Sequence, residues 1–393
     1  MWTYGCFGLL VLCLSFWIGD LCNSKTKGIL SGLLMASVIY IIGYLTGIIP
    51  VTQPADLGLA AMTSLFGQMV IVANLGTMVS LNDLLKQWKT VLACLFSLVV
   101  MAVLVGVVGT ALFGREIGLL AVSPISGGAV ASAMVAEVAT NAGRADLAAL
   151  AMLFNVVQLL FGVPVSSFLL RKYCTHAVEM GIDKAVADGH RQVRQFHFSL
   201  LKPVPEKLNT KYLILAKLAL VGFAAQLISG ATGGSFPSSI AALLLGVVLT
   251  EIGFLDRDSL RKSGFYDFFM FAFMAMLVGA FSSLTIDKLI GFILPLVVLL
   301  TIGVAALALG SMMMGVVLKM DWRLAASLGP AAMFGYPFSQ FLCEDVVREL
   351  HLNEEESSKL LGYVMPQMVI AGFVTVTIAS VFVAGIVAPM IFV

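Results

Sequence analysis

Residues 118–141 read GLLAVSPISGGAVASAMVAEVATN, and residues 323–346 read RLAASLGPAAMFGYPFSQFLCEDV. Both stretches are largely apolar, yet glycine, proline and serine interrupt each of them at matching places, 205 positions apart (118 to 323). These residues loosen the backbone hydrogen bonds of a helix, and hydrocarbon offers no replacement partner. The paired interruptions therefore predict broken or re-entrant segments that line a partly wet cavity, as in a transporter.

The composition places the chain in a membrane. Hydrophobic residues make up 60% of the 393 positions, charged residues make up 11%, and the mean hydropathy is +1.02. A soluble domain of this size needs more charge to cover its surface. The apolar runs are too long and continuous for barrel strands, so we predict an all-α polytopic membrane protein. The first run, 2–21, lacks the features of a signal peptide and is predicted to be a retained helix.

Loop charge predicts the topology. Residues 171–211 carry eight Lys or Arg and separate two sets of six apolar segments, so this linker is predicted to be cytoplasmic. If 118–141 and 323–346 each enter and return on one side, most basic loops fall inside. Five crossings then remain in each half, and an odd number makes the two repeats inverted. The prediction is ten transmembrane helices plus two re-entrant hairpins, in repeats 1–170 and 212–393, with both termini extracytoplasmic in the cell inner membrane.

The hairpin tips hold the candidate binding groups. Ends of half-helices offer free N–H groups to anions, and unwound carbonyls coordinate cations. The first tip offers Ser123, Ser126, Gly127, Gly128 and Ser132. The second offers Pro330, Gly335, Tyr336, Pro337, Ser339 and Gln340. Sodium is predicted near Ser126, Gly127, Pro330 and Gly335. The alternative is that small residues only let helices pack tightly.

Polar residues inside apolar segments extend the candidate site. Carboxylates there carry a proton, bind an ammonium group or neutralise a coupling cation, unless they lie in water at an interface. The candidates for cation coupling are Glu137, Glu344, Asp345 and Asn74. Asn155, Gln158 and Gln367 either line the binding site or bond between helices; the first two share a helix face.

Three short motifs resemble those of the glutamate:sodium symporter family. They are Ser126-Gly127-Gly128, Gly162-Val163-Pro164-Val165 before Arg171 and Lys172, and Met365-Pro366. The resemblance covers nearly the whole chain in layout and implies an elevator-type secondary transporter that forms a homodimer.

These observations predict a sodium- or proton-coupled symporter of a small carboxylate-bearing solute, such as an amino acid. The alternative is a cation/proton antiporter with Glu137 as the exchanging carboxylate. An enzyme is not predicted, because all four histidines lie outside the apolar segments and no HExxH or GxSxG motif occurs. The six cysteines show no CxxC spacing, so no metal or disulfide framework is expected. We expect no organic cofactor and no nucleic acid partner.

Overall fold

The computed structural model describes residues 5–25, 32–78, 85–182, 205, 208–232, 236–335 and 338–392. Every regular element in these ranges is a helix. Seven of the helices described are long and apolar enough to cross a membrane. The chain is therefore an all-helical, multi-pass membrane protein, as predicted. The count of ten crossings and the inverted arrangement stay predictions.

The described helices fall into two compact units. Unit 1 holds α1 (Gly5–Lys25), α2 (Gly32–Thr46), α3 (Gln53–Asp56), α4 (Leu59–Met62), η1 (Thr63–Gly67), α5 (Gln68–Met78), α13 (Lys211–Ala231), α14 (Ser238–Glu251), α15 (Ser259–Lys262), α16 (Tyr266–Gly279) and η2 (Ala280–Ser283). Helix α10 (Ala145–Val157) begins in this unit and ends in the other.

Helix pairs form the core of unit 1. Helix α1 packs on α2, and α13 packs on α14. Helix α14 also crosses α5 where glycine faces glycine: a Cβ added at Gly76 would lie 2.7 Å from the backbone nitrogen of Val247. A Cβ added at Gly246 would collide with the carbonyl oxygen of Ala73. The backbones therefore touch at this crossing, as small residues allow in membrane helices.

Unit 2 holds both interrupted stretches. Its elements are α7 (Trp88–Phe113), α8 (Arg115–Ile125), α9 (Ala129–Asn141), α11 (Leu159–Met180), most of α17 (Ile286–Val317), α18 (Trp322–Leu328), η3 (Gly329–Met333), α19 (Phe338–Arg348), α20 (Glu354–Val374), η4 (Thr375–Ala379), α21 (Ser380–Val387) and η5 (Ala388–Met390). Helix α11 continues ten residues beyond position 170, where the linker was predicted to begin. The charged second half of α11 contacts the end of α19, because Arg171 forms an ion pair with Glu349.

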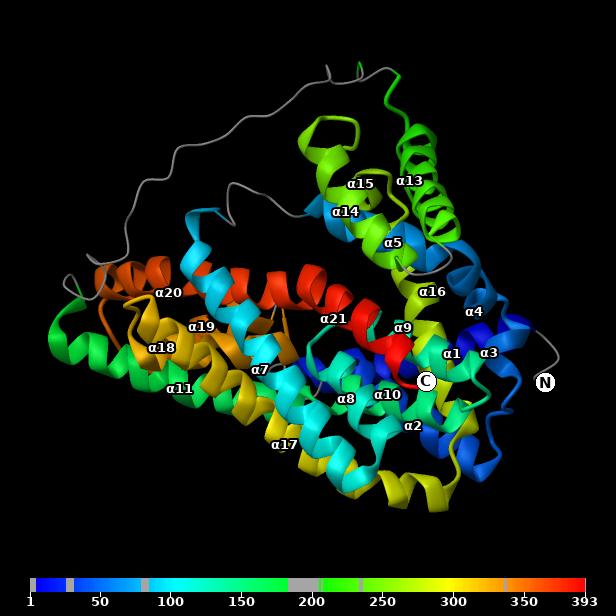
Figure 1. Ribbon diagram of the computed structural model, residues 1–393, viewed down its shortest axis with the longest axis horizontal. Helices are drawn as coiled ribbons and strands as arrows, with labels where there is room; N and C mark the ends of the chain where they lie inside the picture. The colour runs from blue at the N-terminus through cyan, green and yellow to red at the C-terminus, as the bar shows by residue number, and fades with distance from the viewer. Residues whose placement is uncertain are drawn as a thin grey trace. The chain divides into compact units, whose positions relative to one another are not determined.

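The first interrupted stretch folds back on itself. Both α8 and α9 pack along α21 and reach η5 (Figure 1). Arg115, at the start of α8, donates to the carbonyl of Met390 in η5. Gly128, just before α9, lies instead beside Ser380 at the start of α21. The two helices therefore run antiparallel, with the break between them at the closed end.

The second stretch is folded in the same way against α11. Helix α11 contacts α18, η3 and α19 (Figure 1). Gly162, near the start of α11, faces Met333, and Ser166 one turn later donates to the carbonyl of Ser327 at 2.8 Å. The Arg171–Glu349 pair then holds the end of α19 further along the same helix. The closed end of this second pair lies beside the start of α11.

Candidate functional site

The first helix break is built by a proline followed by two glycines. Pro124 lies within the last turn of α8, where its missing N–H weakens the helix. Gly127 and Gly128 have φ of 104° and 87°, values that favour glycine. The Gly127 N–H still bonds the carbonyl of Pro124, and α9 restarts when Ser132 bonds Gly128. Three residues separate α8 from α9, and the last two of them, Gly127 and Gly128, are in this conformation.

The second break follows a tightened turn. Helix α18 ends at Leu328 and continues as the 3-10 turn η3. Gly335 then takes φ of 62°, and its N–H bonds the carbonyl of Ala331 at 2.8 Å. Helix α19 begins at Phe338. Tyr336 and Pro337, both named in the predicted tip, lie outside the described residues.

The two breaks meet within unit 2. A Cβ added at Gly127 would collide with the carbonyl oxygen of Ala332, so the backbone of η3 touches the first break. A Cβ at Gly128 would lie 2.5 Å from the carbonyl oxygen of Val376. Gly335 also approaches Val376, whose Cγ2 atom would be 2.8 Å from a Cβ placed there. Glycine is needed at each position because backbone or side-chain atoms already occupy the space.

A third element at this junction was missed from the sequence. Val376 lies in η4, a π-helical turn that interrupts the α20–α21 helix. Single π-turns are rare and are frequent at functional sites. The stretch 374–380 reads VTVTIAS, and its density of β-branched residues was the available signal. The Val376 carbonyl accepts a hydrogen bond from the Ser380 hydroxyl at 2.8 Å.

Two buried hydroxyl groups near the breaks lack partners. Ser123 and Ser339 are both fully buried, and neither oxygen makes a hydrogen bond within the described part of the chain. Ser126 and Ser132 are equally buried but bond the carbonyls of Ser123 and Gly128 in their own segment. The Ser126 and Ser132 hydroxyls therefore use their protons within their own segment, while the Ser123 and Ser339 hydroxyls have neither donated nor accepted in the described ranges.

The amide side chains of unit 2 are largely engaged in their own helices. Gln367 donates to the carbonyl of Tyr363, and Gln340 donates to the carboxylate of Glu344 at 2.9 Å. Gln158 donates weakly to Asn155 at 3.4 Å, while its own carbonyl oxygen is buried without a partner in the described ranges. For Gln158 and Gln367, no bond to a distant helix is seen among the described residues; such a bond was one of their two predicted roles.

The three predicted carboxylates differ in their surroundings. Asp345 is ion-paired with Arg348, and Glu344 is half-buried and bound by Gln340. Glu137 is exposed at the surface of α9 and makes no hydrogen bond or ion pair with any residue that the structure describes. Glu137 and Glu344 each follow a positive-φ glycine by nine positions (128 to 137 and 335 to 344). The two hairpins thus carry a carboxylate at equal distance from their breaks.

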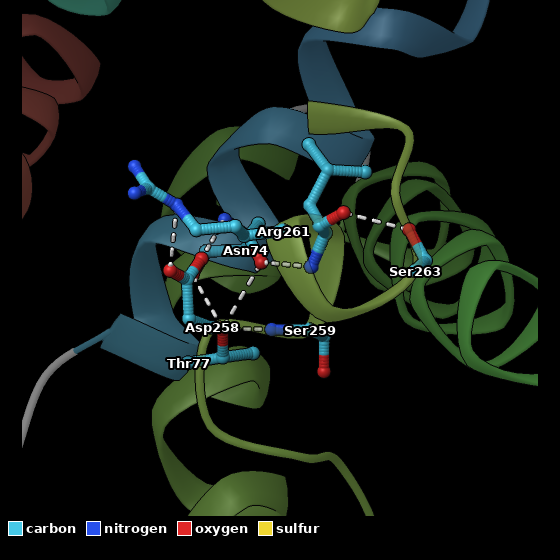
Figure 2. A network of polar contacts seen from close by, with 7 residues as sticks. Asn74, Thr77, Asp258, Ser259, Arg261 and Ser263 are labelled. Carbon is cyan, nitrogen blue, oxygen red and sulfur yellow. Dashed lines mark hydrogen bonds and ion pairs between the residues drawn. The ribbon is translucent and has the colours of Figure 1, made fainter. Parts of the chain in front are cut away.

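Asn74, the remaining candidate, belongs to unit 1 and is engaged in a structural network (Figure 2). Its Oδ1 atom accepts from the backbone N–H of Leu260 at 2.7 Å and from the Thr77 hydroxyl at 3.1 Å. The Thr77 hydroxyl also accepts from the N–H of Ser259. Asn74 therefore ties the end of α5 to the start of α15, and its oxygen is occupied.

The chemistry available at the junction is that of oxygen ligands. Carbonyl and hydroxyl oxygens suit hard cations rather than zinc or copper. No group of three His, Cys, Asp or Glu residues in the described ranges is placed to hold a metal ion. The carbonyls at the breaks and the buried hydroxyls of Ser123 and Ser339 are ligands of the kind that a small hard cation accepts in place of water.

Comparison with known proteins corrects the predicted family. No family model matches the chain, and no curated protein matches it. Among solved structures, the chain is similar to the sodium proton antiporter MjNhaP1 from Methanocaldococcus jannaschii at pH 8, with 13% identity, 98% coverage of each chain and a TM-score of 0.45. The neighbour is an antiporter, so the prediction of a glutamate:sodium symporter is wrong.

The correction extends to everything that the predicted family implied. The symporter mechanism, the amino acid or organic anion cargo and the elevator movement are withdrawn with it. The physical reason is that the Ser126-Gly127-Gly128 step and the proline-bearing helices specify interrupted backbone, a feature that transporters of different cargo share. The expected homodimer loses its support in the same way.

Proposed function

We propose that this protein is a cation/proton antiporter. The observation that carries the proposal is the meeting of two helix breaks in unit 2, with the backbone of η3 against Gly127 and the carbonyl of Val376 against Gly128. A membrane protein leaves its backbone unwound only where protein or a water-lined cavity can satisfy the freed groups. Ion transporters use such discontinuous helices to bind their coupling ions.

The cation is held at the breaks in this proposal. The last carbonyls of α8 and of η3 carry the negative ends of their helix dipoles, which favours a cation beside them. The unpartnered hydroxyls of Ser123 and Ser339 supply further oxygen. Small monovalent cations, sodium first, are the class that such a site accepts.

The proton is carried by Glu137. It is the one charged residue of α9. An ionisable residue in an apolar segment is costly, so its presence there points to a function. Nine residues of helix separate it from Gly128, about 14 Å, so it is not a ligand at the break. In this proposal its charge attracts the cation on its way to the break, and protonation removes that attraction.

Glu344 takes the corresponding place in the second hairpin, already bound by Gln340. The closed ends of the two hairpins meet, while their open ends lie at η5 and at the charged end of α11 respectively. We propose that these open ends face opposite sides of the membrane, in the inverted repeats 1–170 and 212–393, with the linker 171–211 in the cytoplasm. Each carboxylate then serves the approach from one side.

Proteoliposomes test the proposal. The full chain is reconstituted with a pH-sensitive dye inside, and sodium, lithium or potassium is added outside. We expect cation-driven proton movement, its loss in Glu137→Gln, and its retention in Glu354→Gln, which changes an exposed carboxylate at the start of α20. The proposal is refuted if none of the three cations changes the dye signal, or if the signal in Glu137→Gln equals that of the unaltered chain.

A further inference from the structure

Helix α2 carries a row of buried hydroxyl groups along one face. Ser37, Tyr40 and Tyr44 follow one another at three- and four-residue spacing, so their side chains leave the helix on the same side. They are 1%, 0% and 7% exposed. The two tyrosine rings lie edge to face, with centroids 5.6 Å apart. The three hydroxyl groups of this strip, Ser37 to Tyr44, are therefore buried on one face of α2 inside unit 1.

The strip has no hydrogen-bond partner within the part of the chain that the structure describes. None of its three hydroxyl oxygens bonds any residue in the described ranges. The amide of Gln53 lies near the Tyr40 hydroxyl but does not meet hydrogen-bond geometry with it, and the Gln53 Nε2 atom donates to the carbonyl of Gly8 at 3.1 Å. A buried hydroxyl without a partner opposes folding, and three in one row are not accounted for by packing alone.

We propose that the strip from Ser37 to Tyr44 holds a chain of internal water molecules. A hydroxyl group both donates and accepts, and a buried water needs two to four polar partners, which neighbouring hydroxyls on one helix face can supply. Helix α2 packs on α1, α16 and η2, so this face is covered by protein rather than lipid. The strip belongs to unit 1, whereas the helix breaks belong to unit 2. The inference therefore does not depend on ion exchange.

Hydroxyl-radical footprinting of the full chain tests the proposal. X-rays generate radicals from water, and bound water labels the side chains beside it even where bulk solvent cannot reach. We expect Tyr40 to be modified about tenfold faster than Phe281, an equally buried aromatic residue of the same unit, and at a rate comparable with exposed Tyr212. Labelling of Tyr40 as slow as that of Phe281 would overturn the proposal.

Tyr40→Phe gives a second test, in which the direction of the change in melting temperature distinguishes a hydrated strip from a dry one. If water bridges the hydroxyls, removing one leaves the water and its neighbour without a partner, and the melting temperature falls. If the strip is dry, the same change removes an unpartnered group and the melting temperature stays or rises, which would contradict the proposal. Tyr212→Phe, at 67% exposure, is the matched control and should change nothing. Should Tyr40→Phe fail to fold, footprinting of the unaltered chain decides alone.

Discussion

Replacing Gly128 by alanine tests whether the first helix break is a close contact as well as a bend. Gly128 has φ of 87°, and so does Gly114, which precedes α8. An alanine at either position takes a backbone conformation that costs about 1–3 kcal/mol. At Gly114 nothing lies within 4 Å of the added Cβ. At Gly128 the added Cβ would lie 2.5 Å from the carbonyl oxygen of Val376 and 3.1 Å from the Ser380 hydroxyl.

The two variants therefore share the conformational cost and differ in the collision. Overpacking in a well-packed interior costs about 1–3 kcal/mol in addition, so the free energy of unfolding should fall by roughly that much more in Gly128→Ala than in Gly114→Ala. Thermal unfolding in detergent, followed by the amount of protein that remains monodisperse, ranks the variants. Cation-driven proton movement should fall in Gly128→Ala and persist in Gly114→Ala. Equal melting temperatures for the two variants would refute the close approach of η4 to the break.

Three further predictions concern single side chains. Asn74→Ala removes the acceptor for the Leu260 N–H and should lower the free energy of unfolding by about 1–3 kcal/mol; an unchanged melting temperature would contradict the network. Burial alone would raise the pKa of Asp256, but hydrogen bonds from Lys262 and Asn209 outweigh it and hold that pKa below its ordinary value. Asp256→Asn should therefore lower the melting temperature above about pH 4, and the difference from the unaltered chain should vanish as falling pH protonates Asp256. A difference that stays constant down to about pH 2, below the ordinary pKa of an aspartate, would contradict this. Ser339→Ala should leave the melting temperature without added cation unchanged but shrink its rise with sodium; an undiminished rise would remove Ser339 from the site.

The sequence predicted where the helices break but not what meets them. Gly127, Gly128 and Gly335 adopt conformations that other residues avoid, and each has a proline within four residues, so the sequence could mark these positions as breaks. The approach of Val376 depends on the packing of a segment some 250 positions away (128 to 376), and no local pattern encodes it. The roles of the amide side chains could not be predicted for the same reason. Whether Gln367 faces a ligand or its own helix depends on its rotamer and neighbours.

Cargo could not be predicted from these residues, and the error over the family shows why. A serine–glycine–glycine step indicates only that a helix stops and restarts where protein or ligand can bond the freed backbone N–H and C=O groups. That requirement is common to transporters of amino acids and of cations. The side chains that select a ligand are few. Here Ser123 and Ser339 are distinguished from Ser126 and Ser132 only by their hydrogen bonds, which need coordinates.

The packing of the hairpins favours the proposed exchange over free passage. The helix that follows each hairpin supports the other one: α21 packs along α8 and α9, and α11 packs along α18 and α19. The tips themselves touch, Gly127 against Ala332. Neither tip can therefore shift without disturbing the support of its partner, and a tightly packed junction has few alternative arrangements. In the proposed exchanger the junction is rebuilt as one unit, and protonation of Glu137, away from the breaks, removes an attraction for the cation held there. That linkage is how the proposed cycle couples the two fluxes.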